Sequence, residues 1–212
     1  MGKVMLRRRI VIAVMILLGL AGGQATAQEV IGAVTRIQGD ASGTLGDSTR
    51  ALSLEASVFR NEVLSTGEAA RLEVTFADKT RLTLGEKAKL TLGTYVFNPA
   101  AGRRTIRFAA IGALRFLSGP LAKLVTSRVS VTTPFAVVGV RGTEFFAGPI
   151  DDQALGVLLI EGTVSVSNPA GQRILNRPGQ GTNIATPGAA PGPVTVWPPA
   201  KVNRALAAVT FQ

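Results

Sequence analysis

The residues best placed to do chemistry lie on a glycine-rich stretch, in which Arg141 and Glu144 stand three residues apart around Gly142. Backbone N–H groups from Gly139 to Gly142 can form a nest for an anion, which Arg141 would close. A structural corner is the alternative, because glycines permit a sharp change of direction and Arg141 and Glu144 can pair across it. We favour the corner, since β structure is expected to resume at Thr143, unlike in a phosphate-binding loop.

Groups that catalyse reactions are scarce elsewhere in the chain. The sequence has no histidine and no cysteine, which removes the commonest general base, the usual metal ligands and the thiol nucleophile. No serine lies in a Gly-x-Ser-x-Gly or Ser-x-x-Lys pattern. The adjacent acids Asp151 and Asp152 are interpreted as a solvated loop, with a weak calcium site as the alternative. We therefore predict a non-enzyme without cofactor or metal, and rank an enzyme built on Asp, Glu, Arg and Ser last.

Residues 1–27 have the pattern of a secretory signal peptide. A basic start precedes an apolar run at residues 10–21, and Ala25 and Ala27 fit a small-x-small cleavage site before Gln28. An uncleaved anchor is the alternative, but the run is shorter than the ~20 residues of a spanning helix. We expect a periplasmic or secreted protein of the bacterial envelope, with no membrane span after cleavage and no disulfide.

The chain is basic, with 23 lysines and arginines against 13 acidic residues. Four of the basic residues lie in the predicted leader, and the densest patch that remains runs from Arg103 to Lys123. It is interpreted as a solvated strand face, or as a contact for an anionic surface such as lipid headgroups or an acidic partner. Nucleic acid is not expected, because the basic residues lack an aromatic stacking pattern. The candidate partner-binding residues are Arg141, Glu144, Arg103, Arg104, Arg107, Arg115 and Trp197.

Alternating apolar and polar residues indicate an all-β fold. In residues 70–76 Leu72, Val74 and Phe76 point to one side, and residues 80–84 continue the pattern after a turn that Asp78 can brace through its own backbone. Further strands are expected at residues 104–109, 112–117, 129–132, 135–140, 143–147, 155–160 and 163–167. The pattern predicts many short strands in a β-roll or sandwich-like domain.

Composition divides the mature chain into three parts. The β domain is expected at residues 28–184, followed by a Pro/Gly-rich linker at 185–199 and a short amphipathic helix at 200–212. Trp197 is expected either to pin this arm to the β domain or to form an exposed contact for a partner.

Several blocks of residues resemble the FecR domain over roughly residues 30–184. The most specific are residues 139–143 with Phe145, and residues 161–164. Weaker matches are Thr133–Pro134, residues 178–181, Thr66–Gly67, the Leu72-x-Val74-x-Phe76-x-Asp78 strand and Leu82-x-Leu84-Gly85. The sequence departs from the family in two turns, with Lys79 in place of the usual glycine and with residues 86–88.

The resemblance implies a role in signalling. In the full-length regulators of iron-dicitrate transport, this domain is the periplasmic part of a membrane protein. It receives a signal from an outer-membrane receptor and passes it to a cytoplasmic segment that binds a sigma factor. Only nine residues precede the apolar run here, so we expect the sensing or binding domain alone.

Our leading hypothesis is a non-catalytic envelope protein that binds another envelope protein through exposed strand edges or its basic face. A structural or cell-wall role with glycan binding is the alternative. Tyr95 and Trp197 are the polar-tipped aromatic side chains available for it.

Overall fold

Alternating side chains build a curled sheet of many strands. The structure is a computed structural model that describes residues 28–120 and 126–212, so the predicted leader and Lys123 lie outside the described residues. Strand β6 (Arg71–Phe76) buries Leu72, Val74 and Phe76 as predicted, each at most 1% exposed. The all-β fold with a short C-terminal helix is thereby confirmed.

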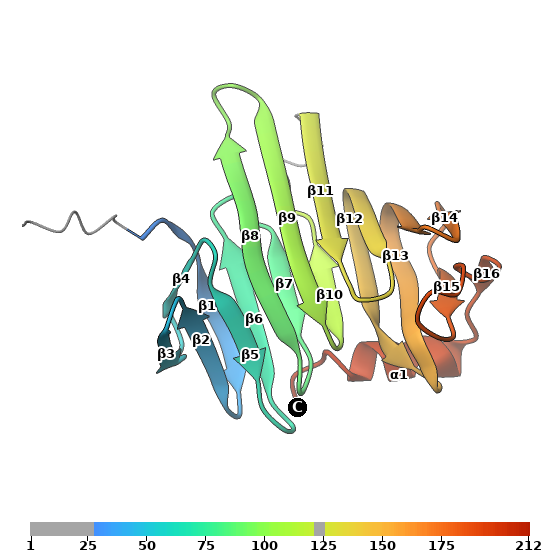
Figure 1. The fold of residues 1–212 in the computed structure, drawn as a ribbon, viewed down its shortest axis with the longest axis horizontal. Coiled ribbons are helices and arrows are strands. Elements are labelled where there is room, and N and C mark those ends of the chain that lie inside the picture. The colour runs from blue at the N-terminus through green and yellow to red at the C-terminus, as the bar shows by residue number, and fades with distance from the viewer. Residues whose placement is uncertain (1–27, 121–125) are drawn as a thin grey trace, which may run out of the picture.

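Two arms of the sheet diverge from one long strand, β12 (Val137–Ile150). In Figure 1 the strands β8, β9 and β11 of one arm lie in front of β7 and β10 of the other. The β9 arm consists of β11 (Thr126–Thr132), β9 (Arg103–Ile111), β8 (Lys89–Asn98), β5 (Val63–Thr66), β2 (Ala41–Leu45) and β3 (Ser48–Ala51). The β7 arm consists of β10 (Leu114–Leu117), β7 (Arg81–Leu84), β6, β1 (Val30–Gln38) and β4 (Ser57–Phe59).

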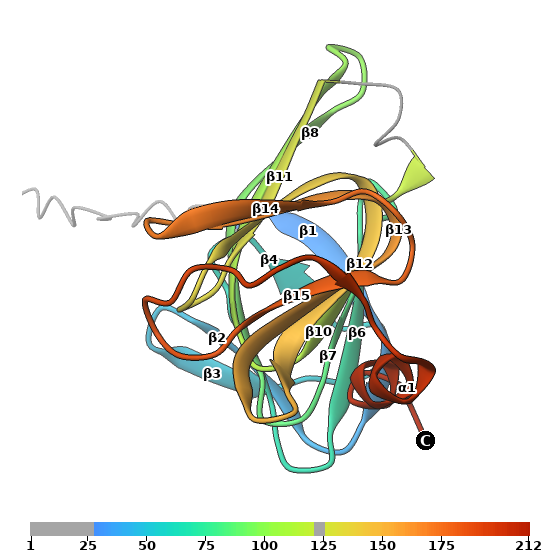
Figure 2. The ribbon, with the colours of Figure 1, turned by 90° about the vertical axis from the view of Figure 1, so that its right-hand side faces the viewer.

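The main core lies between the two arms. Phe76 of β6 stacks on Tyr95 of β8 with ring centroids 5.7 Å apart, and it meets Phe108 of β9 at 5.1 Å. Such aromatic contacts bury large apolar areas and fix the distance between the layers. The β8–β9 hairpin, with β11 beside it, continues past this core and projects beyond the other strands (Figures 1 and 2).

The second half of the fold extends from the other edge of β12. Strand β13 (Gln153–Asn168) pairs with the whole of β12, and its far edge carries β14 (Gly171–Leu175) and β15 (Gln180–Ile184), the latter followed by β16 (Thr195–Val196). Where the sequence predicted two strands at 135–140 and 143–147, and two more at 155–160 and 163–167, the structure has two continuous strands with bulges. The pattern located the residues correctly and misjudged the breaks, because a bulge keeps a strand paired through a change of direction.

The helix α1 (Pro199–Ala207) begins with a proline in its first turn, a position that suits proline because its missing N–H would have no helical partner. A second apolar cluster joins Trp197, Ala205 and Val209 to the sheet residues Phe146 and Leu158. Trp197 is 4% exposed, so it packs on the β domain. No helix within residues 28–120 and 126–212 has the length and apolar character to cross a membrane.

Candidate functional site

The glycine-rich stretch is the place where β12 passes from one arm to the other. Before it, Val140 of β12 pairs with Val129 of β11, and after it Phe145 pairs with Phe116 of β10. The pairing of β12 with β13 shifts register between Arg141 and Glu144. This geometry supports the structural corner, formed by a bulge within one strand.

Two glycines face each other across the corner. Gly142 in β12 has φ +59° and Gly162 in β13 has φ +87°, a region that side chains disfavour. A Cβ atom on Gly162 would lie 2.3 Å from the carbonyl oxygen of Gly142. The two most specific blocks of the resemblance, residues 139–143 and 161–164, are therefore the two halves of one paired bulge.

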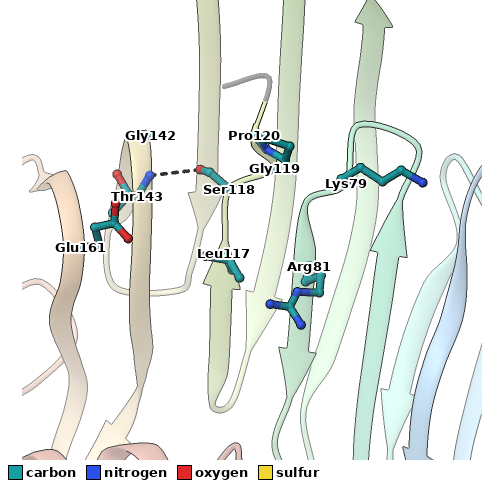
Figure 3. A pocket seen from close by; sticks show the side chains of 9 residues that line it. All are labelled: Lys79, Arg81, Leu117, Ser118, Gly119, Pro120, Gly142, Thr143 and Glu161. Atoms are coloured by element: carbon teal, nitrogen blue, oxygen red, sulfur yellow. Dashed lines mark hydrogen bonds between the residues drawn. The ribbon is translucent and has the colours of Figure 1, made fainter. Parts of the chain in front are cut away.

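The hydroxyl of Thr143 completes this paired bulge. It donates a hydrogen bond to the carbonyl oxygen of Thr163 at 2.8 Å, and it accepts one from the backbone N–H of Arg141 at 3.2 Å. The N–H of Thr143 donates to Ser118 Oγ at 3.2 Å (Figure 3). Because the N–H of Arg141 already has a partner inside the protein, it is not free to join the anion nest considered above.

The predicted pair between Arg141 and Glu144 is replaced by a different one. Glu144 accepts a hydrogen bond from Arg115 Nε at 2.6 Å, across the β10–β12 pairing. Arg141 is exposed, on the stretch of β12 before the bulge. Because of the bulge, Arg141 adjoins the part of β12 that pairs with β11, and Glu144 lies on the part that pairs with β10. The spacing of the two residues along the sequence did not reveal this.

A pocket of about 400 Å³ opens beside the corner. Figure 3 shows Lys79 and Arg81 on one side of it and Thr143 and Glu161 on the other. The other described lining residues are Leu117, Ser118, Gly119, Pro120 and Gly142. The described lining combines the carboxylate of Glu161 with the side chains of Lys79 and Arg81, so the pocket suits binding of polar groups. The sequence analysis missed this pocket, because its lining comes from four separate segments.

Behind the pocket lies a buried ion pair that corrects the prediction for Arg104. Expected on the solvated basic face, Arg104 is 1% exposed and donates from Nε to Asp78 at 2.5 Å. Its guanidinium also donates to Thr80 Oγ1 and, at 3.1 Å, to Ser127 Oγ. Asp78 braces its turn as predicted, because Asp78 Oδ1 accepts from the N–H of Thr80 at 3.1 Å. The signal was available, since Arg104 alternates in phase with the apolar residues of β9.

Tyr95 belongs to the same network. Its hydroxyl donates to Asp78 Oδ1 at 3.2 Å and accepts from the backbone N–H of Asp78 at 3.0 Å. Burial, followed by the negative charge of Asp78, raises the pKa of Tyr95 above its ordinary value. Because the ring is buried, it is not available to stack on a glycan.

The remaining candidates separate into exposed and enclosed residues. Arg103 and Arg107 are exposed on β9, whereas Arg115 is engaged with Glu144 and Trp197 is buried. Trp197 therefore serves as the predicted pin of the C-terminal arm, and the alternative of an exposed contact is corrected.

Asp151 and Asp152 form the tight turn between β12 and β13, both with positive φ. Asp151 accepts hydrogen bonds from Arg204 of α1 at 2.9 and 3.0 Å. Loss of hydration acts to raise the pKa of Asp151, but the hydrogen bonds and charges of Arg204 and then Lys201 hold this pKa below its ordinary 3.8. This turn thus docks the helix. Within residues 28–120 and 126–212 no group of three or more metal-ligating side chains occurs.

Residues 62–165 match the family model described as FecR protein. The resemblance to the FecR family is confirmed. The matched segment contains the paired bulge, the pocket and the buried Arg104–Asp78 pair, so all three are features of the FecR-family region of this chain. A comparison with curated proteins found no significant match.

Two crystal structures share the fold of a large part of this chain. Both are described as a candidate anti-sigma factor from Parabacteroides distasonis ATCC 8503, with 20% identity and TM-scores of 0.54 and 0.53. Each comparison covers 68% of this chain, and 64% or 63% of the other. The chain thus spans less than two thirds of the length of these neighbours, and at this identity the likeness shows the fold alone.

Proposed function

We propose that this protein is a non-catalytic, protein-binding sensing module of the bacterial envelope that takes part in signal transduction. The observation that carries the proposal is the FecR family match, which includes the paired bulge and the pocket beside it. The description of the structural neighbours as candidate anti-sigma factors supports a regulatory role. The secretory pattern of residues 1–27 supports the envelope location.

The chemistry of the site supports binding over catalysis. Its buried polar groups already have partners inside the protein, because Arg104 pairs with Asp78 and Thr143 bonds the backbone of the corner. The alternative of glycan binding loses its main support, because Tyr95 and Trp197 are each 4% exposed. Stacking on sugar rings would need those faces in solvent.

In-cell crosslinking tests the proposal. The tagged full chain, expressed in its own cells, is treated with an amine-reactive crosslinker, for which the exposed Lys79, Lys87 and Lys89 provide attachment points. Mass spectrometry then identifies the captured molecules, with an unrelated exported protein carrying the same tag as the control. We expect one reproducible membrane receptor or regulator, whose deletion changes the transcriptional response of the cell. Capture of glycan or wall fragments alone would favour the structural role instead.

A further inference from the structure

One outer face of the β9 arm combines unpaired arginines with exposed aliphatic side chains. Opposite residues in the pairing lie on the same side of a sheet. One such row runs Val96, Thr105, Arg128 across β8, β9 and β11, and the next runs Arg107, Ser130, Gly139, Ser165, Ile174 as far as β14. We call this surface the arginine face. It comprises Arg103, Arg107, Arg128, Arg141, Val96, Ile111, Val137 and Ile174, all exposed.

The four arginines of this face lack acidic partners. None of them forms a side-chain hydrogen bond or ion pair with any residue of 28–120 or 126–212. By contrast, five arginines elsewhere in the protein each pair with a carboxylate: Arg50, Arg60, Arg104, Arg115 and Arg204. Strands β8, β9, β11 and β14 contain no Asp or Glu at all. The face therefore carries uncompensated positive charge that an anionic partner would neutralise.

The face is also shaped for contact. Arg128 precedes Val129 and Arg141 follows Val140 in an antiparallel pair of strands, so the two arginines stand side by side. They border a shallow hollow of about 310 Å³ that Ile174 closes on another side. At Gly139 a side chain is absent and the hydroxyl of Ser165 fills the space, which leaves the floor of this hollow low and polar.

The opposite end of the face is apolar. Ile111, 56% exposed, lines two adjoining hollows of about 300 and 260 Å³ together with Pro134 and Ala110. Four of the seven large hydrophobic side chains that are exposed in the described part of the chain lie on the arginine face. Such a concentration marks an interaction surface more than an ordinary solvated strand.

We propose that the arginine face binds an extended acidic segment of a partner protein, whose carboxylates meet the arginines and whose aliphatic residues fill the hollows around Ile111. This inference rests on the proposed function and names the surface and the chemistry of its partner. Arginine forms bidentate pairs with carboxylates and is enriched in protein interfaces. Arg103 and Arg107 lie four residues apart on one strand, about 13 Å, which is the spacing of side chains at positions i and i+4 of an extended partner.

A protein partner fits this face better than an anionic membrane does. Membrane-binding surfaces carry tryptophan or tyrosine at the headgroup level. The single Trp and the single Tyr of this protein are buried away from the face. The exposed aliphatic side chains lie on paired strands that also carry the arginines, and so can meet apolar side chains of an extended peptide.

The test uses a fluorescent peptide with a Glu/Asp half and a Val/Leu half, and its Gln/Asn counterpart as the neutral control. The full chain is compared with the triple variant Arg107→Ser/Arg128→Ser/Arg141→Ser. A matched variant, Arg60→Ser/Lys87→Ser/Arg177→Ser, removes the same charge from exposed sites elsewhere. We expect about threefold weaker binding of the acidic peptide for each arginine removed from the face, typical of exposed ion pairs, and no such loss in the matched variant.

Several results would overturn the inference. They are equal losses in the two triple variants, equal affinity for the neutral peptide, or binding of the full chain to phosphatidylglycerol vesicles but not to the peptide. Circular dichroism melting establishes that both variants fold. If in-cell crosslinking captures the same partner with the arginine-face variant as with the unaltered chain, the proposed function stands and the arginine face is not its binding surface.

Discussion

Arg104 Nε lies 2.5 Å from a carboxylate oxygen of Asp78, and neither side chain is more than 1% exposed. The pair joins β9 to the turn between β6 and β7, and so connects the two arms behind the pocket. A buried ion pair is costly to break on one side, because the remaining charge keeps no compensation. The pair thus stabilises the relative position of the arms.

Removal of one partner of this ion pair should therefore strongly destabilise the fold. We expect Asp78→Ala or Arg104→Met to lower the free energy of unfolding by about 3–5 kcal/mol, and the double variant Asp78→Ala/Arg104→Met to cost less than the sum. Arg103→Met is the matched control on the same strand, where an exposed side chain should change stability by no more than about 0.5 kcal/mol. Urea unfolding measures all four. Strictly additive single and double variants would contradict a direct coupling.

The paired bulge gives a second prediction. Gly162→Ala combines an unfavourable positive φ with a clash against the Gly142 carbonyl, and we expect a loss of about 2–5 kcal/mol. Gly46→Ala is the control, because Gly46 has φ +59° but no neighbouring atom within 4 Å. It should lose only about 1–2 kcal/mol. Thermal unfolding compares the two variants. Equal losses of stability would show that the close approach of Gly162 to the Gly142 carbonyl does not contribute to the cost.

The C-terminal arm should depend on one aromatic anchor. Trp197→Ala removes the largest side chain that holds α1 to the sheet, and truncation of a buried aromatic costs about 3–5 kcal/mol. We expect trypsin to cut earlier at Lys201 and Arg204 in this variant, because the arm opens more often. Val196→Ala, at a neighbouring residue that is 72% exposed, should leave the rate of cleavage unchanged. Unchanged cleavage in Trp197→Ala would mean that the arm is held by other contacts.

Tyr95 should make the protein sensitive to alkali. Its pKa in the folded state is raised above the ordinary value of 10.0, so the unfolded chain loses this proton first as pH increases. The associated stability is present below about pH 10 and is lost as pH rises toward the folded pKa. Since the protein has a single tyrosine, tyrosinate absorbance reports this group alone. We expect its ionisation to coincide with unfolding, and Tyr95→Phe to weaken the alkaline loss of stability. Ionisation of Tyr95 in a chain that remains folded would contradict this.

Strand positions were predictable because each arm has one buried face, which imposes an apolar side chain at every second residue. Leu72, Val74 and Phe76 show this directly. The same rule, applied to β9, would have placed Arg104 inside with Ile106 and Phe108, but two adjacent arginines were read as one exposed patch. A charged residue at a strand position that alternation assigns to the buried face is thus itself a signal for an internal ion pair.

Long-range features could not be predicted from the pattern. The partner of Arg104 is 26 residues away, and Glu144 pairs with Arg115 because β12 changes neighbours at the bulge. The sequence predicted only part of the arginine face. Arg128 was missed, because the parallel pairing of β11 with β9 is what places it beside the other arginines. Local alternation fixes which side a residue faces, but it does not determine which strands become neighbours.

The parallel pairing of β9 with β11 has a consequence for the order of folding. Parallel neighbours need a crossover connection, and here the crossover includes β10, which pairs with β7 on the other arm. The hairpins β8–β9, β11–β12 and β12–β13 pair residues that are close along the chain, so we expect them to form before the parallel pairing of β9 with β11. Pulse-labelled hydrogen exchange should protect the backbone amides that bond within these hairpins before those that bond between β9 and β11. Arg107 and Arg128 are brought together by the last of these steps, so only a chain that has completed folding can present the whole arginine face to a partner.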